Sequence, residues 1–349
     1  MKFLRFLGSV LMFLFTGLLI FTVFLVLVIV ILVKGPSLQA REIFVHSCEE
    51  TSALKFLPRW FLPDEEVDRI LAPVMEEPVQ TAEAFVPLGY DTEAGGDAAF
   101  GAKGSADGTE AEDAQEPIVV EDIRGGTYVG KMMIVSDPKR VVIGTLPTYG
   151  EGVSGRFLPQ FIEAYEAVGG TNAGGFEDPD GHGKGGIPDG IVIENGEIRY
   201  GSAGSYYRNI IGLDADGKLH VGHMTGAQAL SDGIVTGVSF SPGEILVQDG
   251  VPAEHRASGL NPRTAIGQRA DGAMLLLVIE GRHAGSLGAS YDDLRDEMVK
   301  YGAVTASMLD GGTSSAMYYE GEQITRGSNL LGMRLLPTTI LVLPEEKAG

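Results

Sequence analysis

The chain has 349 residues and a single cysteine, Cys48, which excludes an intrachain disulfide framework and a cysteine-based zinc cluster. Asp and Glu outnumber Lys and Arg by 47 to 26, so the formal net charge is −21 and would repel a nucleic-acid backbone. The 49 glycines follow no Gly-x-y period, which excludes a collagen-like chain. We therefore expect an acidic globular protein with no nucleic-acid partner.

The first predicted element is an apolar helix over residues 6–33, which contain no charged side chain. At 1.5 Å per residue it would be roughly 42 Å long, enough to cross a bilayer with some tilt. A secretory signal peptide is the alternative, but its apolar region is usually about 7–15 residues long, so an uncleaved anchor is favoured. Lys2 and Arg5 precede the run, while Lys34 and Arg41 follow it. With the N-terminal amine, this distribution predicts a single-pass membrane protein, with a cytoplasmic N-terminus and an extracytoplasmic domain.

A juxtamembrane segment with a short helix is predicted over residues 34–92. Asp64 is its expected N-cap, and an apolar face follows at helical spacing. Phe56, Trp60 and Phe61 precede the helix and suit a membrane interface. Docking of this segment on the main domain is an equal alternative.

Residues 93–116 contain seven acids and no Val, Ile or Leu, so they predict a disordered acidic linker. Residues 117–345 are instead rich in short apolar runs separated by Asn-Gly and Asp-Gly dipeptides, which are typical of hairpin turns. The predicted fold class is α+β, with a mixed, largely antiparallel sheet and a few helices. The expected strands are 141–146, 190–194, 234–240, 273–279, 303–309, 317–319 and 338–343, and the expected helices are 156–167 and one that starts at Ser290 with Asp293 completing a capping box.

The strongest local signal is a loop directly after the strand predicted at 303–309. An acid, two glycines and two hydroxyls gather there: Asp310, Gly311, Gly312, Ser314 and Ser315. Glycines let backbone N–H groups approach a ligand closely, and polar groups at strand ends often form sites. The alternative is a plain hairpin turn in which Asp310 caps the backbone.

Three further strand ends carry polar or charged side chains. Asn172 lies just before a pair of glycines, and Arg263 lies at the start of a predicted strand. Glu280 and Arg282 follow directly after the apolar run 273–279. Paired carboxylates suit glycosidic cleavage, whereas arginines bind phosphate through bidentate hydrogen bonds. Each arginine taken singly is more often a surface charge, but together these residues favour a ligand site at the strand ends.

One loop partly matches a calcium-binding pattern. Asp178, Asp180, His182 and Asp189 occupy positions 1, 3, 5 and 12 of that pattern, but histidine and aspartate replace two of the expected ligands. A solvent-exposed turn is favoured, with calcium as the alternative, and no cofactor is predicted.

Four motifs occur in order between residues 169 and 343: Asn172-Ala-Gly-Gly-Phe, Asn261-Pro-Arg-Thr-Ala-Ile-Gly, Glu280-Gly-Arg and Leu309-Asp-Gly-Gly-Thr-Ser-Ser. With a closing Arg334 before the last strand, the sequence resembles the phosphodiester glycosidase family. The resemblance implies Asp310 and Glu280 as catalytic carboxylates and a set of substrate-binding residues: Asn172, Arg263, Arg282, Gly311, Gly312, Ser314, Ser315 and Arg334.

The function that this resemblance implies is a membrane-anchored extracytoplasmic hydrolase. It would cleave the glycosidic bond of a sugar-1-phosphodiester in envelope or exopolysaccharide-type glycans. The alternative is a non-catalytic cell-envelope module that binds glycan or teichoic acid. Either way, the expected partners are a phosphorylated glycan and the lipid bilayer.

Overall fold

The computed structural model describes residues 2–51, 54–72, 117–179, 182–328 and 332–345. The fold is α+β with antiparallel sheets, as the sequence predicts. The linker predicted at 93–116 and the stretch 73–92 before it lie outside the described residues, so those domain boundaries stay predictions.

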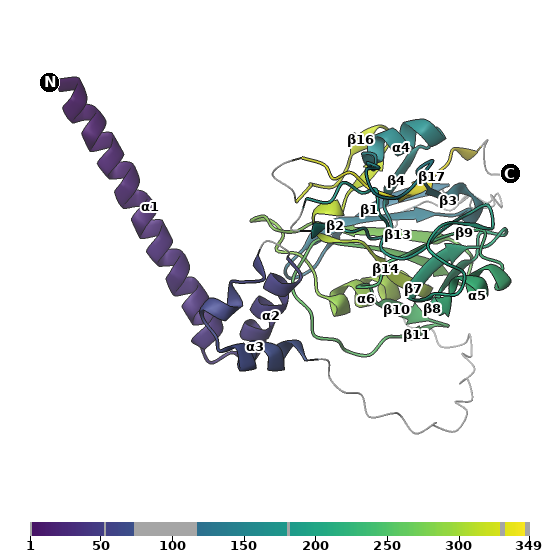
Figure 1. Cartoon of the computed structure of the whole chain (residues 1–349), viewed down its shortest axis with the longest axis horizontal. Helices are drawn as coiled ribbons and strands as arrows, with labels where there is room; N and C mark the ends of the chain where they lie inside the picture. Colours follow the sequence, from purple (N-terminus) through teal and green to yellow (C-terminus); the bar gives the residue numbers. More distant parts are fainter. Residues whose placement is uncertain (1, 52–53, 73–116, 180–181, 329–331, 346–349) are drawn as a thin grey trace, which may run out of the picture. The chain divides into compact units, whose positions relative to one another are not determined.

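The N-terminal region is helical (Figure 1), with α1 over Lys2–Lys34, α2 over Leu38–Glu49, the 3-10 turn η2 over Pro58–Trp60 and α3 over Asp64–Leu71. The span Phe6–Lys34 has a mean hydropathy of 3.2 and is long and apolar enough to cross a membrane, a test that a signal sequence also passes. One apolar cluster joins these helices: Val33, Val45, Leu62 and Val67.

The α3 helix corrects one detail of the sequence analysis. Asp64 is the first residue of the helix and not its N-cap, because the N–H groups of Glu66 and Val67 donate hydrogen bonds to the carbonyl of Pro63. The Asp64 carboxylate instead pairs with Arg59.

Three antiparallel sheets form the domain (Figure 1). The seven-stranded sheet has the order β1 (Ile118–Arg124), β2 (Val129–Val135), β13 (Met274–Ile279), β12 (Arg263–Arg269), β14 (Ala303–Leu309), β10 (Ile245–Gln248) and β11 (Val251–Pro252). The second has the order β16 (Glu322–Gln323), β15 (Met317–Tyr319), β4 (Gly169–Asn172), β17 (Thr339–Val342) and β3 (Val141–Gly144). The third has the order β6 (Glu197–Tyr200), β5 (Val192–Glu194), β9 (Thr236–Ser239), β7 (Tyr206–Leu213) and β8 (Leu219–Thr225).

Short helices and 3-10 turns lie between the strands: α4 (Leu158–Tyr165), α5 (Gly226–Ser231), α6 (Tyr291–Lys300), η3 (Pro138–Arg140) and η5 (Gly312–Ser314). The capping box predicted for α6 is confirmed, because Ser290 and Asp293 exchange hydrogen bonds. The Asn195-Gly196 hairpin between β5 and β6 is also confirmed, with φ of 54° and 73° at the two residues. Both values are positive, as a tight hairpin with this twist requires.

The continuous apolar run of β13 follows from its place in the middle of the seven-stranded sheet. Its six residues are all buried, and alternate side chains enter different apolar clusters. Leu276 belongs to the cluster shared with the second sheet, whereas Leu277 belongs to the cluster that includes Leu294 of α6. A strand covered on both faces has no polar face, which explains the absence of alternation in its sequence.

Candidate active site

The registers of three neighbouring strands bring the predicted site residues to one edge of the seven-stranded sheet. Arg263, at the start of β12, lies opposite the last residue of β13, and Thr264 lies opposite the last residue of β14. Arg282 follows β13 and Asp310 follows β14. Antiparallel pairing therefore gathers residues that are far apart in the sequence.

A cavity of about 540 Å³ lies at this edge. Predicted residues in its wall are Arg263, Arg282, Asp310, Gly311, Gly312, Ser314 and Arg334. Phe176, Phe240 and Tyr291 add aromatic surface, while Glu50, Asp178 and Asp189 add carboxylates. The cavity thus combines three arginines, several acids and apolar ring faces, a mixture of charged and apolar surface that suits a small ligand.

Asp310 is held where the end of β14 meets β4. Its N–H donates to the carbonyl of Ala173 at 2.9 Å, and the next turn is fixed by a bond from the Gly312 N–H to the carbonyl of Pro262 at 2.8 Å. Gly312 has a φ of 61°, a conformation that glycine adopts without strain. The loop therefore has a defined shape around the carboxyl group.

Burial raises the pKa of Asp310 from 3.8 to about 7, because the low-dielectric surroundings disfavour the charged form. Hydrogen bonds from Ser314 and from the Gly311 backbone lower this pKa in part, as does the positive charge of Arg334, and Asp178 raises it slightly. A carboxyl group with a pKa near 7 exchanges its proton readily at neutral pH, which suits acid–base or nucleophilic work.

Asn172 is completely buried and its amide bonds to protein groups. Its Nδ2 donates to the carbonyl of Asp310, while its Oδ1 accepts from Thr264 Oγ1 at 2.9 Å and from the Ala316 N–H at 3.3 Å. Asn172 is not among the described residues that line the cavity. Its geometry is that of a positioning residue, which fixes the Asp310 loop against β4 and β12.

Asn172→Ala is expected to lower the free energy of unfolding by about 2–4 kcal/mol, because buried donors and acceptors each cost about 1–3 kcal/mol when left unsatisfied. Urea unfolding of the full chain in detergent measures this, with the exposed Gln248→Ala as control. A change below about 0.5 kcal/mol, the size usual for surface substitutions, would contradict the positioning role.

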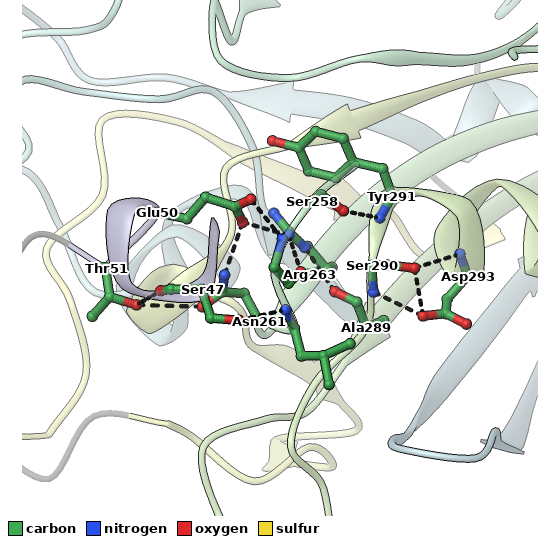
Figure 2. A network of polar contacts seen from close by, with 12 residues as sticks. Ser47, Glu50, Thr51, Ser258, Asn261, Arg263, Ala289, Ser290, Tyr291 and Asp293 are labelled. Carbon is green, nitrogen blue, oxygen red and sulfur yellow. Dashed lines mark hydrogen bonds and ion pairs between the residues drawn. The ribbon is translucent and has the colours of Figure 1, made fainter. Parts of the chain in front are cut away.

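Arg263 is buried, with only 7% of its side chain exposed. Its Nε donates to the Ala289 carbonyl at 3.1 Å, and its Nη2 donates to the Gly259 carbonyl at 2.8 Å and to Glu50 at 2.6 Å. The guanidinium lies 4.5 Å from the ring centroid of Tyr291, in a cation–π contact. Figure 2 shows this network.

Arg282 reaches the same end of the cavity from the turn after β13. Its Nη2 donates to Thr51 Oγ1 and Asn261 Oδ1, each at 3.0 Å. Burial lowers the pKa of Arg282, and the nearby charge of Arg263 lowers it further. An anion between two such guanidinium groups would be stabilised by both.

Arg334 holds the opposite part of the wall. Its Nη2 donates to Asp178 Oδ1 at 2.6 Å and to the Gly183 carbonyl at 3.2 Å, and its guanidinium lies 5.2 Å from the ring centroid of Phe176. Arg334 also lines a neighbouring cavity of about 250 Å³. Arg334 therefore belongs to the walls of both cavities.

Glu280 and Ser315 occupy different surroundings from the other predicted residues. The Glu280 carboxylate accepts from the Arg326 N–H at 2.8 Å and contacts His283 Nε2 at 3.1 Å. Ser315 Oγ lies 3.2 Å from Thr264 Oγ1, at hydrogen-bond distance. Neither lines the 540 Å³ cavity among the residues that the structure describes, although Ser315 lines the smaller one. The observed contacts of Glu280 fix the loops that follow β13 and β16.

The acidic loop of the calcium alternative is arranged around protein partners. Asp178 accepts from the Gly183 N–H as well as from Arg334, and Asp189 accepts from the Ser241 N–H at 3.2 Å. Asp180 lies outside the described residues. Within the described part of the chain, no three metal-ligating side chains are grouped closely enough to hold an ion.

Sequence reasoning missed four parts of the cavity wall. Asn261 lies inside a recognised motif, yet only its arginine was predicted to act. Phe240 and Tyr291 carry no motif, and single aromatic residues are usually core residues. Glu50 is more than 200 residues away from Arg263 in the sequence, and no local pattern indicates their contact.

The sequence of this domain matches a glycosidase-type family. The chain belongs to the phosphodiester glycosidase family, whose model matches residues 165–343. This confirms the resemblance that the four motifs indicate.

Two known proteins show how far the similarity extends. The SPbeta prophage-derived uncharacterized protein YomE of Bacillus subtilis (strain 168) is 32% identical over 114 residues, which are 31% of this chain and 18% of that protein. The zebrafish N-acetylglucosamine-1-phosphodiester α-N-acetylglucosaminidase catalytic domain, auto-inhibited by pro-peptide, aligns with a TM-score of 0.51 and 19% identity over 65% of this chain and 82% of that one. At this identity the structural match establishes a shared fold.

Proposed function

We propose that the protein is a hydrolase that cleaves the bond between an anomeric carbon and the phosphate oxygen of a sugar-1-phosphodiester. The observation that carries the proposal is the sharing of one cavity by Asp310 and the arginines Arg263, Arg282 and Arg334. The family supports a glycosidase-type reaction. The arginines supply positive charge and hydrogen-bond donors for a phosphate, which a neutral glycoside does not need.

In the proposed reaction, Arg263 and Arg282 bind the phosphate at their end of the cavity. A phosphate leaves readily, so strong protonation of the leaving oxygen is unnecessary. The Asp310 carboxylate then meets the oxocarbenium-like transition state, either as a nucleophile or as a base toward water. Phe240 offers an apolar ring face to the sugar, and Gly311 and Gly312 keep the backbone close to it. Glu280 does not line the cavity among the described residues, so the proposed reaction does not depend on it. A part for Glu280 as a second carboxylate would require Glu280→Gln to lose activity, which the experiment below tests separately.

The apolar helix α1 supports a membrane-anchored protein with this domain on the extracytoplasmic side, because positive charges are denser before the helix than after it. On that side the accessible substrates are envelope or exopolysaccharide-type glycans with phosphodiester links. This placement defines the substrate panel to be tested.

The experiment incubates the full chain in detergent with a panel of α-sugar-1-phosphodiesters and measures the sugar released. We expect turnover of at least one substrate by the wild-type protein and by Glu280→Gln, and a rate lowered about 10³-fold in Asp310→Asn. Equal loss in both variants would make Glu280 a catalytic partner. Glycan binding without hydrolysis by any form would assign the non-catalytic module instead.

A further inference from the structure

The end of α2 and the two residues after it, Ser47 to Thr51, contact the loop that leads into β12. Ser47 Oγ accepts from the Leu260 N–H at 2.9 Å. At Gly259 a Cβ atom would lie 2.3 Å from the Ser47 backbone nitrogen, so the two segments approach more closely than any other residue permits. Figure 2 shows the α2 end beside this loop.

Glu50 places its carboxylate on three donors of that loop. Oε2 accepts from Arg263 Nη2 at 2.6 Å and from Asn261 Nδ2 at 2.8 Å, and Oε1 accepts from the Gly259 N–H at 2.9 Å. One guanidinium, one amide and one backbone N–H form a set that binds any anion with two oxygens about as far apart as those of a carboxylate or phosphate. The carboxylate therefore occupies a built anion site at the cavity wall.

The neighbouring guanidinium, that of Arg282, has hydrogen-bond partners of another kind. The hydrogen bonds of Arg282 within the described residues go to neutral oxygens, those of Thr51 and Asn261. Thus Arg263 has an acidic partner from α2, whereas Arg282 does not have one among the ion pairs of the described residues. An external anion that binds both Arg263 and Arg282 would have to compete with the Glu50 carboxylate for Arg263.

The contacts that hold the α2 end on the loop are polar, which makes them exchangeable. They involve Ser47, Glu50 and Thr51, whereas the apolar residue Val45 of α2 packs with Val33 and Val67 of α1 and α3. The helical cluster can keep its own core when these polar contacts are replaced. An ion pair to a partly exposed carboxylate is also worth little net energy once another anion offers the same bonds.

We infer that Glu50 is an internal competitor of the substrate, whose carboxylate occupies the anion site of Gly259, Asn261 and Arg263 until an external phosphate displaces it. The phosphate then bridges Arg263 and Arg282, and the α2 end leaves the loop. The inference rests on the proposed function only for the identity of the displacing anion as a phosphodiester. The anion site itself is defined by the three donors.

The test uses inorganic phosphate and the full chain in detergent, with binding measured by calorimetry. Glu50→Gln is expected to tighten phosphate binding about tenfold, because the competing charge is removed. The matched control is Glu49→Gln, which alters the adjacent, more exposed acid paired with Lys55 and should change affinity less than twofold. In the wild type, saturating phosphate should also speed amide exchange over residues 47–51.

Unchanged or weaker phosphate binding by Glu50→Gln would overturn the inference and make Glu50 a part of the ligand site. If that variant is unstable, Ser47→Ala loosens the same contact without altering a charge and should also tighten binding. Sugar release separates the two proposals. If Glu50→Gln binds phosphate more tightly but no form releases sugar from any substrate, the hydrolase function is wrong and the competitor role of Glu50 is supported. If Glu50→Gln releases sugar with the KM and phosphate affinity of the wild type, the competitor role is wrong and the hydrolase function is supported.

Discussion

Asp310→Asn is expected to lower kcat/KM for a sugar-1-phosphodiester by about 10³-fold, within the range of about 10²–10⁴ that loss of a positioned base produces. The reason is that asparagine keeps the size of the side chain and its hydrogen bonds but neither accepts a proton nor attacks carbon. Rates of sugar release at several substrate concentrations measure the effect. A loss smaller than tenfold would remove Asp310 from the reaction.

The wild-type pH profile tests the same residue in a second way. The pKa of Asp310 is raised to about 7, so a reaction that needs the carboxylate should slow about tenfold for each pH unit below 7 and level off above it. Glu280→Gln should keep this profile. A decline above pH 7 would instead show that the protonated form acts, as a general acid.

Stability provides the control for misfolding. The folded protein holds the Asp310 proton up to about pH 7, whereas the unfolded chain releases it near pH 4, so the wild type loses stability between these values. The loss amounts to about 4 kcal/mol by pH 8. Because asparagine does not titrate, Asp310→Asn should be stabilised relative to the wild type by about that amount more at pH 8 than at pH 4.

Arg282→Met is expected to lower kcat/KM by about 10–200-fold, since a charge-assisted hydrogen bond to phosphate contributes about 1.5–3 kcal/mol. Methionine keeps an unbranched, apolar side chain but provides no donor for the phosphate. The loss should weaken binding of inorganic phosphate as well, which separates this role from a direct part in bond breaking.

The matched control is Arg269→Met, at the far end of β12, where the guanidinium pairs with Asp271 and does not line the cavity. We expect it to leave kcat/KM within about twofold. Equal losses in both variants would indicate a general effect of charge on an acidic protein, and no loss in either would remove Arg282 from phosphate binding.

The sequence predicted the elements well where local physics decides them. The strand Ala303–Leu309 and the strand Met317–Tyr319 have the predicted bounds, and the Ser290 capping box and the Asn195-Gly196 turn are confirmed. Backbone preference and hydrogen bonds over a few residues govern such features. The four ordered motifs also identified the family, which the family model over residues 165–343 confirms.

Side-chain partners were predicted less well. Asn172 and Glu280 have the residue types of a binding site, yet Asn172 fixes the Asp310 loop and Glu280 bonds to the backbone of Arg326. A motif specifies which residue occurs at a strand end. It does not specify whether that side chain points into the cavity or toward the next loop, because this depends on packing between strands that are remote in the sequence.

By itself, the sequence determined an apolar N-terminal helix, an acidic α+β domain and a family-specific set of strand-end loops. Only the tertiary structure decided that three arginines share a cavity with Asp310, and that Glu50, directly after α2, binds Arg263. The physical reason is that periodicity and turn chemistry act over a few residues. The raised pKa of Asp310 and the anion site instead arise from burial and charge contributed by segments more than a hundred residues apart.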